Sequence, residues 1–391
     1  MDPRAIHLTT LTSGWRTGDD EQARVLRILE QVPPEQLDTV LAGLDPEQLL
    51  GALSDRGAGR AYLSGVLDLL LVRRREALSV PVLAGLVAAL HRGRTPRHHQ
   101  ELLVDVLRAT EGRDFHDLKY RINASGDRHD LEQLVFHDLD EDLQDLLLKH
   151  LAEQAGVDPT SDLRILCDID DTTRCMLHDD RYPRGIIYPG VVQLLLELDQ
   201  GAVTDPARVG DLTFVTARPG GPLGLFERYT RDGLSGLGLP PHTVLGGSLL
   251  NLHTKAAITR RKLENMERDR LLFPECRMVF IGDSGQADGE VGAQMRTRAP
   301  EHIVGTLLHD VSGLGQAERE AWAQRGVQVF DTYAGAAAHA ARWGLITVEQ
   351  ARRVADAVRT GLAVLELSTE QRRLLEDRLA ADDAAIEALG A

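Results

Sequence analysis

The pattern of apolar and polar residues changes once along the chain, near residue 160. Before that point, apolar residues recur at intervals of three and four, which is typical of helices that bury one face. This spacing predicts an all-helical N-terminal domain over residues 1–155. Asp19-Asp20-Glu21 indicates the start of one of its helices, because acidic side chains stabilise the first turn of a helix.

The two halves of this helical region resemble each other weakly. Leu29 matches Leu107 and Leu63 matches Leu143, at offsets of 78 and 80 residues. The offsets suggest a duplicated unit, although leucine-rich helices also align by chance. Because the region holds no recognisable group of metal ligands or nucleophiles, we expect it to be an interaction or scaffold module.

From residue 160 on, short apolar runs alternate with helical patterns. Strands are predicted at 163–169, 212–216, 243–245, 278–282, 303–308 and 327–330. Helices are predicted between them, at 191–198, around 223–232, and at 255–271, 317–324 and 334–343. This alternation predicts an α/β domain at residues 160–345, with helices on both faces of a doubly wound parallel sheet.

Residues 346–391 return to a helical pattern and form a C-terminal extension. One apolar stripe runs along it, formed by Val348, Ala351, Val354, Val358, Leu362 and Leu365. The stripe is suited either to packing against the body of the chain or to forming a dimer, and the sequence leaves both open.

The first predicted strand of the α/β domain ends in a cluster of carboxylates. Asp168, Asp170 and Asp171 lie at its carboxyl end, the edge where ligands bind in an open parallel sheet. Carboxylates this close repel one another unless a cation neutralises them, and Mg²⁺ is the usual choice beside phosphate. Because alternate strand residues point to the same side, we expect Asp168 and Asp170 to act together, one attacking and the other transferring a proton.

Three further segments supply the other groups that phosphate chemistry needs. The second predicted strand ends at the hydroxyl of Thr216, and Arg218 follows it. The helix at 255–271 carries Lys255 and Lys262, either of which offers a fixed cation. The strand at 278–282 opens into a glycine-rich acidic loop, Gly282-Asp283-Ser284-Gly285-Gln286-Ala287-Asp288. Since parallel strand ends converge on one crevice, these groups are predicted to form one site.

The composition narrows the class of protein. A formal net charge of −16 over 391 residues argues against a nucleic-acid partner and against docking on anionic lipid through a basic surface. The three cysteines include no Cys-x-x-Cys pair, so they indicate neither a disulfide framework nor a zinc site. The first residues lack the pattern of a signal peptide, and the longest apolar run, 80–90, is too short to span a bilayer. We therefore expect a soluble, cytoplasmic protein.

Together these motifs resemble those of the haloacid dehalogenase superfamily of aspartyl-phosphate phosphatases. The matching elements, in order, are Asp168-x-Asp-x-Thr172, Thr216, Lys262 and Gly282-Asp283-x-x-x-x-Asp288. More closely, Asp-Ile-Asp-Asp-Thr, the lysine eleven residues before Phe273-Pro274, and Gly-Asp-Ser-Gly-Gln-x-Asp-x-Glu are similar to the catalytic domain of phosphatidate phosphatases of the actin-patch-protein type. The resemblance covers about residues 160–345 and implies a capless, Rossmann-like fold of the haloacid dehalogenase type.

The resemblance implies a role for each matching residue. Asp168 would be the nucleophile that becomes phosphorylated, Asp170 the acid that protonates the leaving alcohol and then activates water, and Thr216 a donor to a phosphoryl oxygen. Lys262 would neutralise the developing charge, with Lys255 as the alternative. The implied ligands of Mg²⁺ are Asp168, Asp170, Asp283 and Asp288. Contacts to the substrate are predicted for Thr172, Arg218, Lys255 and Ser284.

The chain also departs from the family pattern in ways that bear on the substrate. Gly289 follows the last acid, where proline is common, and His309-Asp310 stands where an arginine is usual. The second motif is Thr-Ala-Arg-Pro rather than Ser-Gly-Arg-Pro. The interval between the first two motifs leaves room for a flap at 173–188 but not for a cap domain, and an open site suits bulky substrates.

The resemblance therefore implies a Mg²⁺-dependent phosphomonoester phosphatase, with several alternatives open. Its substrate is either a phosphatidate-like lipid or the phosphate of a protein, nucleotide end or small molecule. Another hypothesis is a helical scaffold protein whose phosphatase fold is weak or silent. Phosphoryl transfer to a different acceptor and dehalogenation fit less well, because no cap is present and Asp170 is retained. A protein partner or self-association, through the N-terminal domain or the C-terminal helix, fits any of these.

Overall fold

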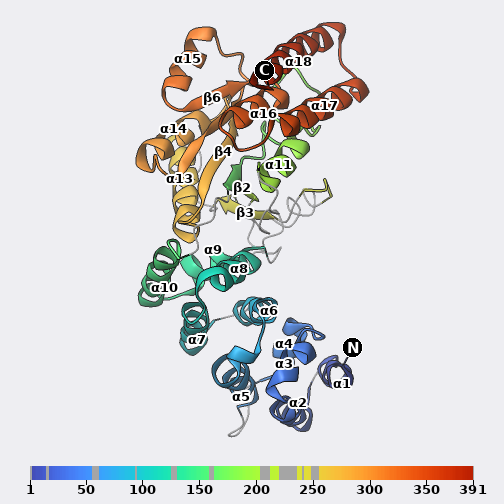
Figure 1. Cartoon of the computed structure of the whole chain (residues 1–391), viewed down its shortest axis with the longest axis vertical. Helices are drawn as coiled ribbons and strands as arrows, with labels where there is room; N and C mark the ends of the chain where they lie inside the picture. Colours follow the sequence, from blue (N-terminus) through green and yellow to red (C-terminus); the bar gives the residue numbers. More distant parts are fainter. Residues whose placement is uncertain are drawn as a thin grey trace. The chain divides into compact units, whose positions relative to one another are not determined.

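The computed structural model describes ten stretches of the chain. They are residues 2–14, 17–54, 61–92, 95–124, 130–157, 163–202, 212–219, 236–239, 242–247 and 255–390, and the side chains of 216–219, 245–247 and 255 are not described. The described residues form two compact units, one up to residue 157 and the other from residue 163 on (Figure 1). We describe each unit by itself.

The first unit is helical in every element that the structure describes. The helices are α1 (Pro3–Thr12), α2 (Asp19–Gln31), α3 (Pro34–Leu41), α4 (Pro46–Gly51), α5 (Tyr62–Leu67), α6 (Val80–His91), α7 (Arg97–Arg108), α8 (Gly112–Asn123), α9 (Leu131–Gln133) and α10 (Glu141–Gln154). Two π-helical turns, Asp68–Arg73 and Leu134–Asp138, and a 3₁₀ turn at Arg75–Ala77 complete it. Helices α6, α7, α8 and α10 begin 77, 78, 78 and 79 residues after α1, α2, α3 and α5. The helix order thus repeats at nearly the offset of the leucine pattern.

The starts of these helices follow from local chemistry. Helix α2 begins at Asp19, as predicted, and the Glu21 side chain accepts a hydrogen bond from the Gly18 N–H at 2.8 Å. Helix α4 begins at Pro46, since a proline in the first turn loses no helical hydrogen bond. The Asp45 side chain caps this helix by accepting from the Glu47 N–H at 2.9 Å.

The second unit is built on a six-stranded sheet in which every pair of neighbouring strands is parallel. The strands are β1 (Leu163–Cys167), β2 (Leu212–Pro219), β3 (His242–Gly247), β4 (Arg277–Asp283), β5 (Ile303–His309) and β6 (Val327–Phe330). The strand order is β3-β2-β1-β4-β5-β6. The predicted α/β class and the six predicted strands are confirmed. Strand order reverses between β1 and β4, so a ligand crevice is expected at their carboxyl ends.

Helices cover both faces of the sheet (Figure 1). One face is covered by α11 (Val191–Gln200), α16 (Tyr333–Arg342), α17 (Val348–Val364) and α18 (Thr369–Gly390), and the other by α13 (Lys255–Leu272), α14 (Asp288–Arg298) and α15 (Gln316–Gln324). Alternation along β1 supplies both cores, because Ile165 and Cys167 join the first and Leu166 the second. The helix predicted around 223–232 lies outside the described residues.

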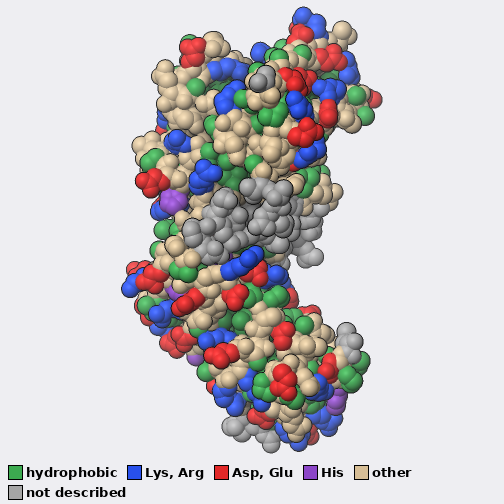
Figure 2. All heavy atoms as spheres, in the orientation of Figure 1, with side chains coloured by type: hydrophobic (Ala, Val, Ile, Leu, Met, Phe, Trp, Pro, Cys, Tyr) green, Lys and Arg blue, Asp and Glu red, His purple; other side chains and the backbone are tan. Residues whose placement is uncertain are grey.

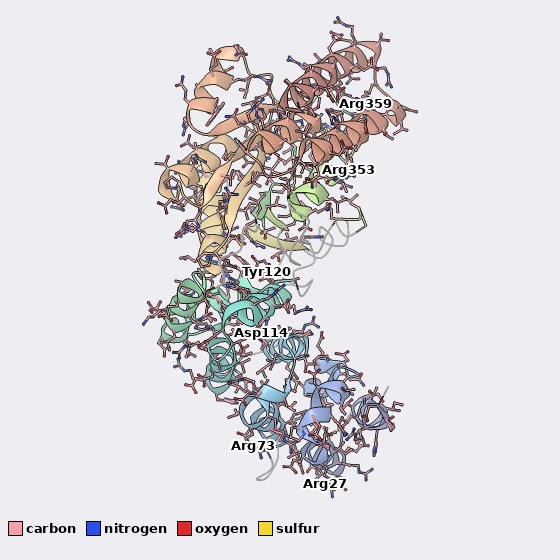
Figure 3. All side chains as sticks on the ribbon, viewed as in Figure 1. Arg27, Arg73, Asp114, Tyr120, Arg353 and Arg359 are labelled. Carbon is pink, nitrogen blue, oxygen red and sulfur yellow. The ribbon has the colours of Figure 1, made fainter. Side chains whose placement is uncertain are left out.

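The C-terminal helices belong to the same compact unit as the sheet. Val354 and Val358 of the predicted apolar stripe are fully buried in the core that α17 shares with α11 and α16. Two arginines of α17, labelled in Figure 3, pair with the neighbouring helices: Arg353 with Glu197 of α11 at 2.7 Å, and Arg359 with Asp383 of α18 at 2.8 Å. The stripe therefore packs against the body of the chain, which is one of the two arrangements that the sequence left open.

A buried ion pair anchors α13 to the amino end of β1. The Arg164 side chain is fully buried and donates to Asp269 of α13 at 2.7 and 3.2 Å and to the Thr213 hydroxyl at 2.7 Å. Its guanidinium also lies 3.8 Å from the ring centroid of Phe273. Since α13 carries Lys262, this anchor fixes the helix that brings a lysine to the opposite end of the sheet.

The substitution Asp269→Asn is expected to lower the free energy of unfolding by about 3–5 kcal/mol, because it leaves a buried guanidinium without its counter-charge. The measurement is urea unfolding followed by circular dichroism. Glu267→Gln is the matched control, because Glu267 pairs with Arg270 on the same helix but both side chains are partly exposed. It is expected to cost less than about 1 kcal/mol. Equal losses for the two variants would contradict the anchoring role of the buried pair.

No described helix combines the length and apolar character that a membrane span needs. On the face shown in Figure 2, Lys and Arg side chains are interspersed with Asp and Glu over the described surface, and no continuous basic patch forms there.

Candidate active site

The carboxylates predicted from three separate segments converge at the carboxyl ends of β1 and β4. The Asp168 N–H donates to the Ile281 carbonyl at 2.9 Å, which extends the pairing of β1 with β4 by one residue. Asp283 is the last residue of β4, and Asp288 is the first residue of α14. Carboxylate oxygens of Asp168, Asp283 and Asp288 all lie within 4.8 Å of one another.

A lysine from the neighbouring helix lies between two of these carboxylates. The Lys262 ammonium is 2.8 Å from Asp168 Oδ1 and 2.5 Å from Asp288 Oδ1. All four side chains are buried, with at most 3 % of any of these residues exposed. We call Asp168, Asp283, Asp288 and Lys262 the carboxylate–lysine cluster. It contains the preferred catalytic lysine and three of the four predicted metal ligands, one of which, Asp168, is also the predicted nucleophile.

A glycine makes the close approach of Asp288 to the sheet possible. A Cβ atom at Gly282 would lie 2.5 Å from both Cβ and Oδ2 of Asp288, closer than real Cβ contacts occur. With glycine there, Asp288 Oδ2 accepts the backbone N–H of Asp283 at 3.2 Å. The Gly-Asp pair of the motif therefore has two functions, since the glycine makes room for one carboxylate and the aspartate supplies another.

The electrostatics of the cluster favour a divalent cation. Burial raises the pKa of Asp168 to about 7, against partial compensation by Lys262, and burial with the nearby Asp288 charge raises the pKa of Asp283 well above its ordinary value. For Lys262, burial lowers the pKa, but the carboxylates of Asp168 and Asp288 outweigh it and the net shift is upward. Three ionised carboxylates and one ammonium leave a net charge of −2, which one divalent cation would neutralise.

These pKa shifts mean that ionising the cluster lowers the stability of the folded state when no cation is bound. Because the folded-state pKa of Asp168 exceeds the unfolded value, its contribution to stability is favourable at low pH and is lost as the pH rises toward neutrality. Carboxylate oxygens are the ligands that Mg²⁺ prefers, and binding it would offset this cost. The three carboxylates therefore fit the predicted metal by both ligand type and charge.

The remaining predicted site residues differ in how they relate to the cluster. Asp170 is half-buried, and its carboxylate is not among the three clustered ones. Thr172 is fully buried, and its hydroxyl has no hydrogen-bond partner among the described residues. The Ser284 hydroxyl lies 2.7 Å from the Ser312 hydroxyl and accepts the Val311 N–H at 3.0 Å, so it links the loops after β4 and β5. The side chains of Thr216, Arg218 and Lys255 lie outside the described residues.

Asp171, the third carboxylate of the first motif, organises the following loop. Its φ is +56°, a left-handed conformation that only Asn, Asp and Gly adopt readily. Its carboxylate accepts the backbone N–H groups of Met176, Leu177 and His178 at 2.7–2.9 Å, and it lies 2.8 Å from Nδ1 of His178. These bonds lower the pKa of Asp171 despite its burial. The residue therefore organises the loop, and its carboxylate also lies within 4.8 Å of a ring nitrogen of His178 and a carboxylate oxygen of Asp283.

The loop brings in residues that the sequence pattern did not single out. His178 lies against Gly285, where an added Cβ would be 2.9 Å from its ring. The Arg181 guanidinium lies 3.2 Å from Nε2 of His309, the residue that stands where the resemblance leads one to expect an arginine. Burial lowers the pKa of His309 to about 4, so it is neutral at pH 7. An arginine thus reaches this position from the loop after β1 rather than from β5.

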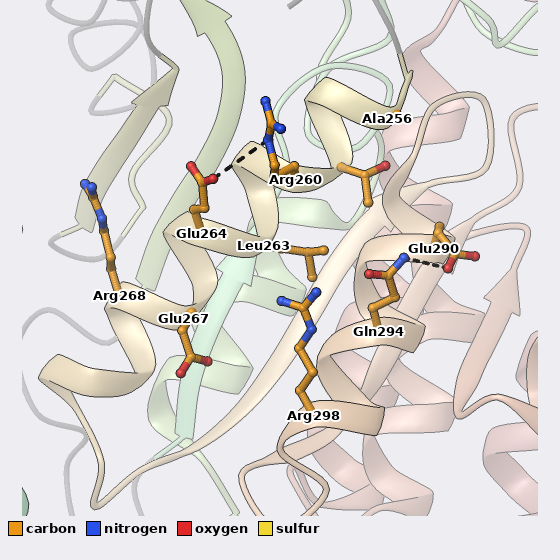
Figure 4. A pocket seen from close by; sticks show the side chains of 10 residues that line it. Ala256, Arg260, Leu263, Glu264, Glu267, Arg268, Glu290, Gln294 and Arg298 are labelled. Carbon is orange, nitrogen blue, oxygen red and sulfur yellow. Dashed lines mark hydrogen bonds and ion pairs between the residues drawn. The ribbon is translucent and has the colours of Figure 1, made fainter.

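Two of the hollows among the described residues lie on the second unit. A cavity of about 730 Å³ is lined in part by His178, Ser284 and Gly285, which belong to loops beside the carboxylate–lysine cluster. A groove of about 700 Å³ runs between α13 and α14 (Figure 4), where Arg260 lies 3.9 Å from Glu264 and the Gln294 amide donates to Glu290 at 2.8 Å. The four residues of the cluster line neither hollow, but the cavity lining includes Ser284 and Gly285, which directly follow Asp283. The cavity is therefore the better candidate for a substrate site.

Comparison of the chain with protein-family models, with curated proteins and with solved structures finds no match.

Proposed function

We propose that the chain is a Mg²⁺-dependent phosphomonoester phosphatase that acts through a phospho-aspartyl intermediate on Asp168. The observation that carries the proposal is the carboxylate–lysine cluster, which leaves three carboxylates and one ammonium buried where strand order reverses in a parallel sheet. Burying an ionised cluster is costly and contributes nothing to packing, so its retention favours a catalytic role. For the same reason we do not favour a scaffold protein with a silent phosphatase fold.

In the first proposed step, a carboxylate oxygen of Asp168 attacks the phosphorus and the ester oxygen leaves. Asp170, two residues further along the chain and half-buried, donates the proton that the leaving alkoxide takes up. The contact between Lys262 and Asp168 supports a role for the lysine in offsetting the charge on the phosphoryl oxygens during transfer. Mg²⁺ held by Asp168, Asp283 and Asp288 would supply further neutralisation of those oxygens when bound.

In the second proposed step, water hydrolyses the acyl phosphate. Asp170, now ionised, removes a proton from the water as it attacks phosphorus, and the P–O bond to Asp168 breaks to regenerate the carboxylate. The phosphate produced carries the oxygen of that water. Thr216 is proposed to donate to a phosphoryl oxygen, and Arg218, Lys255 and Ser284 to contact the substrate.

The choice between lipid and soluble substrates is tested by comparing turnover under matched conditions. Phosphatidate in mixed micelles and the soluble ester p-nitrophenyl phosphate are supplied at equal concentration, with Mg²⁺ and with EDTA. We expect Mg²⁺-dependent hydrolysis that EDTA reduces to background, and a preference for phosphatidate if the resemblance extends to the substrate. A preference for the soluble ester would remove the lipid hypothesis and keep the mechanism. Full activity in EDTA would contradict the proposed function itself.

A further inference from the structure

The 730 Å³ cavity lies beside the loop that follows Asp283 of the carboxylate–lysine cluster. Small-molecule sites in proteins commonly occupy about 300–1,000 Å³. Ser284 and Gly285 line the cavity and directly follow Asp283, whose Oδ1 accepts the Gly285 N–H at 2.7 Å. A phosphate bound at the carboxylate–lysine cluster would therefore have the cavity as its neighbour.

Three arginines from three different elements line this cavity and converge on one carboxylate. Arg181 comes from the loop after β1, Arg319 from α15 and Arg378 from α18. Each pairs with Asp331: Arg181 at 3.5 Å, Arg319 at 2.9 Å and Arg378 at 3.6 Å. One carboxylate cannot satisfy three guanidinium groups. The other hydrogen-bond acceptors of each arginine therefore determine which arginine has N–H donors available for a ligand.

Arg181 and Arg319 are fully engaged within the protein. Arg181 donates to both oxygens of the buried Asp179 at 2.9 Å. Arg319 donates to Asp310 at 2.5 Å and to both oxygens of Asp331 at 2.9 and 3.1 Å. These contacts hold the two side chains in place and neutralise their charges.

Arg378 differs from the other two. Its side chain is half exposed, and it makes no hydrogen bond to any other residue that the structure describes; its contact with Asp331, at 3.6 Å, is an ion pair without a hydrogen bond. A guanidinium has five N–H donors in a planar fork that matches carboxylate and phosphate oxygens. Leu374, one turn earlier on α18, lines the same cavity and offers an apolar contact beside it.

We propose that Arg378 binds a second anionic group of the substrate, so that the preferred substrates are phosphate esters that also carry a carboxylate or a second phosphate. The proposal rests on the proposed phosphatase function and adds a role for α18: the C-terminal helix supplies the residue that selects the substrate. The exposed Asp180 lies on the rim of the same cavity and opposes a general attraction of anions. Selection therefore depends on hydrogen bonds from Arg378 rather than on the net charge of the cavity.

The test measures binding rather than turnover, with matched pairs of ligands. Calorimetric titrations with Mg²⁺ use the full-length chain carrying Asp168→Asn, so that no ligand is hydrolysed. One pair is 3-phosphoglycerate and glycerol 3-phosphate, which differ by a carboxylate; the other is fructose 1,6-bisphosphate and fructose 6-phosphate, which differ by a phosphate. We expect the doubly anionic member of at least one pair to bind about tenfold more tightly, as one charge-assisted hydrogen-bonded contact would give.

Two further substitutions in this background separate a specific contact from a general charge effect. Arg378→Gln should remove the preference by weakening only the doubly anionic ligand, whereas Asp180→Asn should keep or widen it. Equal affinities within both pairs, or an equal loss for both members in Arg378→Gln, would overturn the proposal. Failure of the phosphatase function is seen separately, as absence of turnover of p-nitrophenyl phosphate by the wild-type chain.

Discussion

The substitution Asp168→Asn is expected to reduce turnover of p-nitrophenyl phosphate by at least about 10³-fold, the scale of loss when a catalytic nucleophile is removed. The asparagine amide keeps the size of the side chain and still offers an oxygen to the Lys262 ammonium, which now lies 2.8 Å from Asp168. It removes the nucleophile and one of the three clustered carboxylates. The measurement is steady-state kinetics with saturating Mg²⁺.

The fold should survive this change, and a melting curve checks that it does. Because burial raises the pKa of Asp168 to about 7, the neutral amide avoids the cost of a buried charge, so the melting temperature without Mg²⁺ should not fall. The stabilisation that Mg²⁺ gives the wild type should shrink. Asp356→Asn on the exposed side of α17 is the control for an Asp-to-Asn change and should leave activity unaltered. Retention of a tenth of wild-type turnover by Asp168→Asn would rule out the aspartyl-phosphate mechanism.

The substitution Lys262→Met is expected to produce the second large effect. The thioether chain fills similar space but leaves Asp168 and Asp288 without the ammonium that now contacts both. Turnover should fall by about 10²–10³-fold, because the charge that develops on the phosphoryl oxygens loses a fixed donor. Without Mg²⁺ at neutral pH, the free energy of unfolding should fall by about 3–5 kcal/mol, since buried carboxylates lose their partner.

Lys255→Met is the matched comparison and addresses the choice between the two lysines. Lys255 is the first residue of α13, whereas Lys262 is the residue of that helix that contacts the carboxylates. We therefore expect Lys255→Met to keep most of its kcat and to lose activity mainly through a higher KM, since Lys255 is proposed to contact the substrate. Loss of turnover in Lys255→Met with retention in Lys262→Met would assign the catalytic lysine to Lys255 and contradict the role that we give the cluster.

The fold class and the core of the site followed from local patterns. Strands that are buried on both faces appear as continuous apolar runs, and the carboxyl ends of parallel strands share one edge of the sheet. For this reason, residues as far apart as Asp168 and Asp283 were expected to meet. The clustering of Asp168, Asp283 and Asp288 around Lys262 agrees with that expectation.

The parts of the site that the sequence did not reveal depend on contacts between segments that are far apart in the sequence. Nothing in the spacing of Arg181 indicates that it meets His309, because the contact requires the loop after β1 to fold across the end of β5. Likewise, Arg378 lies 88 residues beyond Glu290, the end of the Gly-Asp motif, in a C-terminal extension that the pattern marked only as helical around it. Asp171 was grouped by position with Asp168 and Asp170, the two carboxylates predicted to be catalytic, yet its backbone is left-handed and its carboxylate accepts hydrogen bonds from the loop.

The most direct test of the central claim is to trap the phosphorylated residue. The Asp170→Asn variant is mixed with Mg²⁺ and p-nitrophenyl phosphate, whose leaving group needs no acid, so the acyl phosphate should form and persist without the base that activates water. Acid quenching and borohydride reduction convert a phosphorylated aspartate to homoserine, which peptide mass spectrometry locates. We predict homoserine at residue 168. Homoserine at another aspartate, or none at residue 168 in wild-type protein quenched during active turnover, would contradict the proposed mechanism.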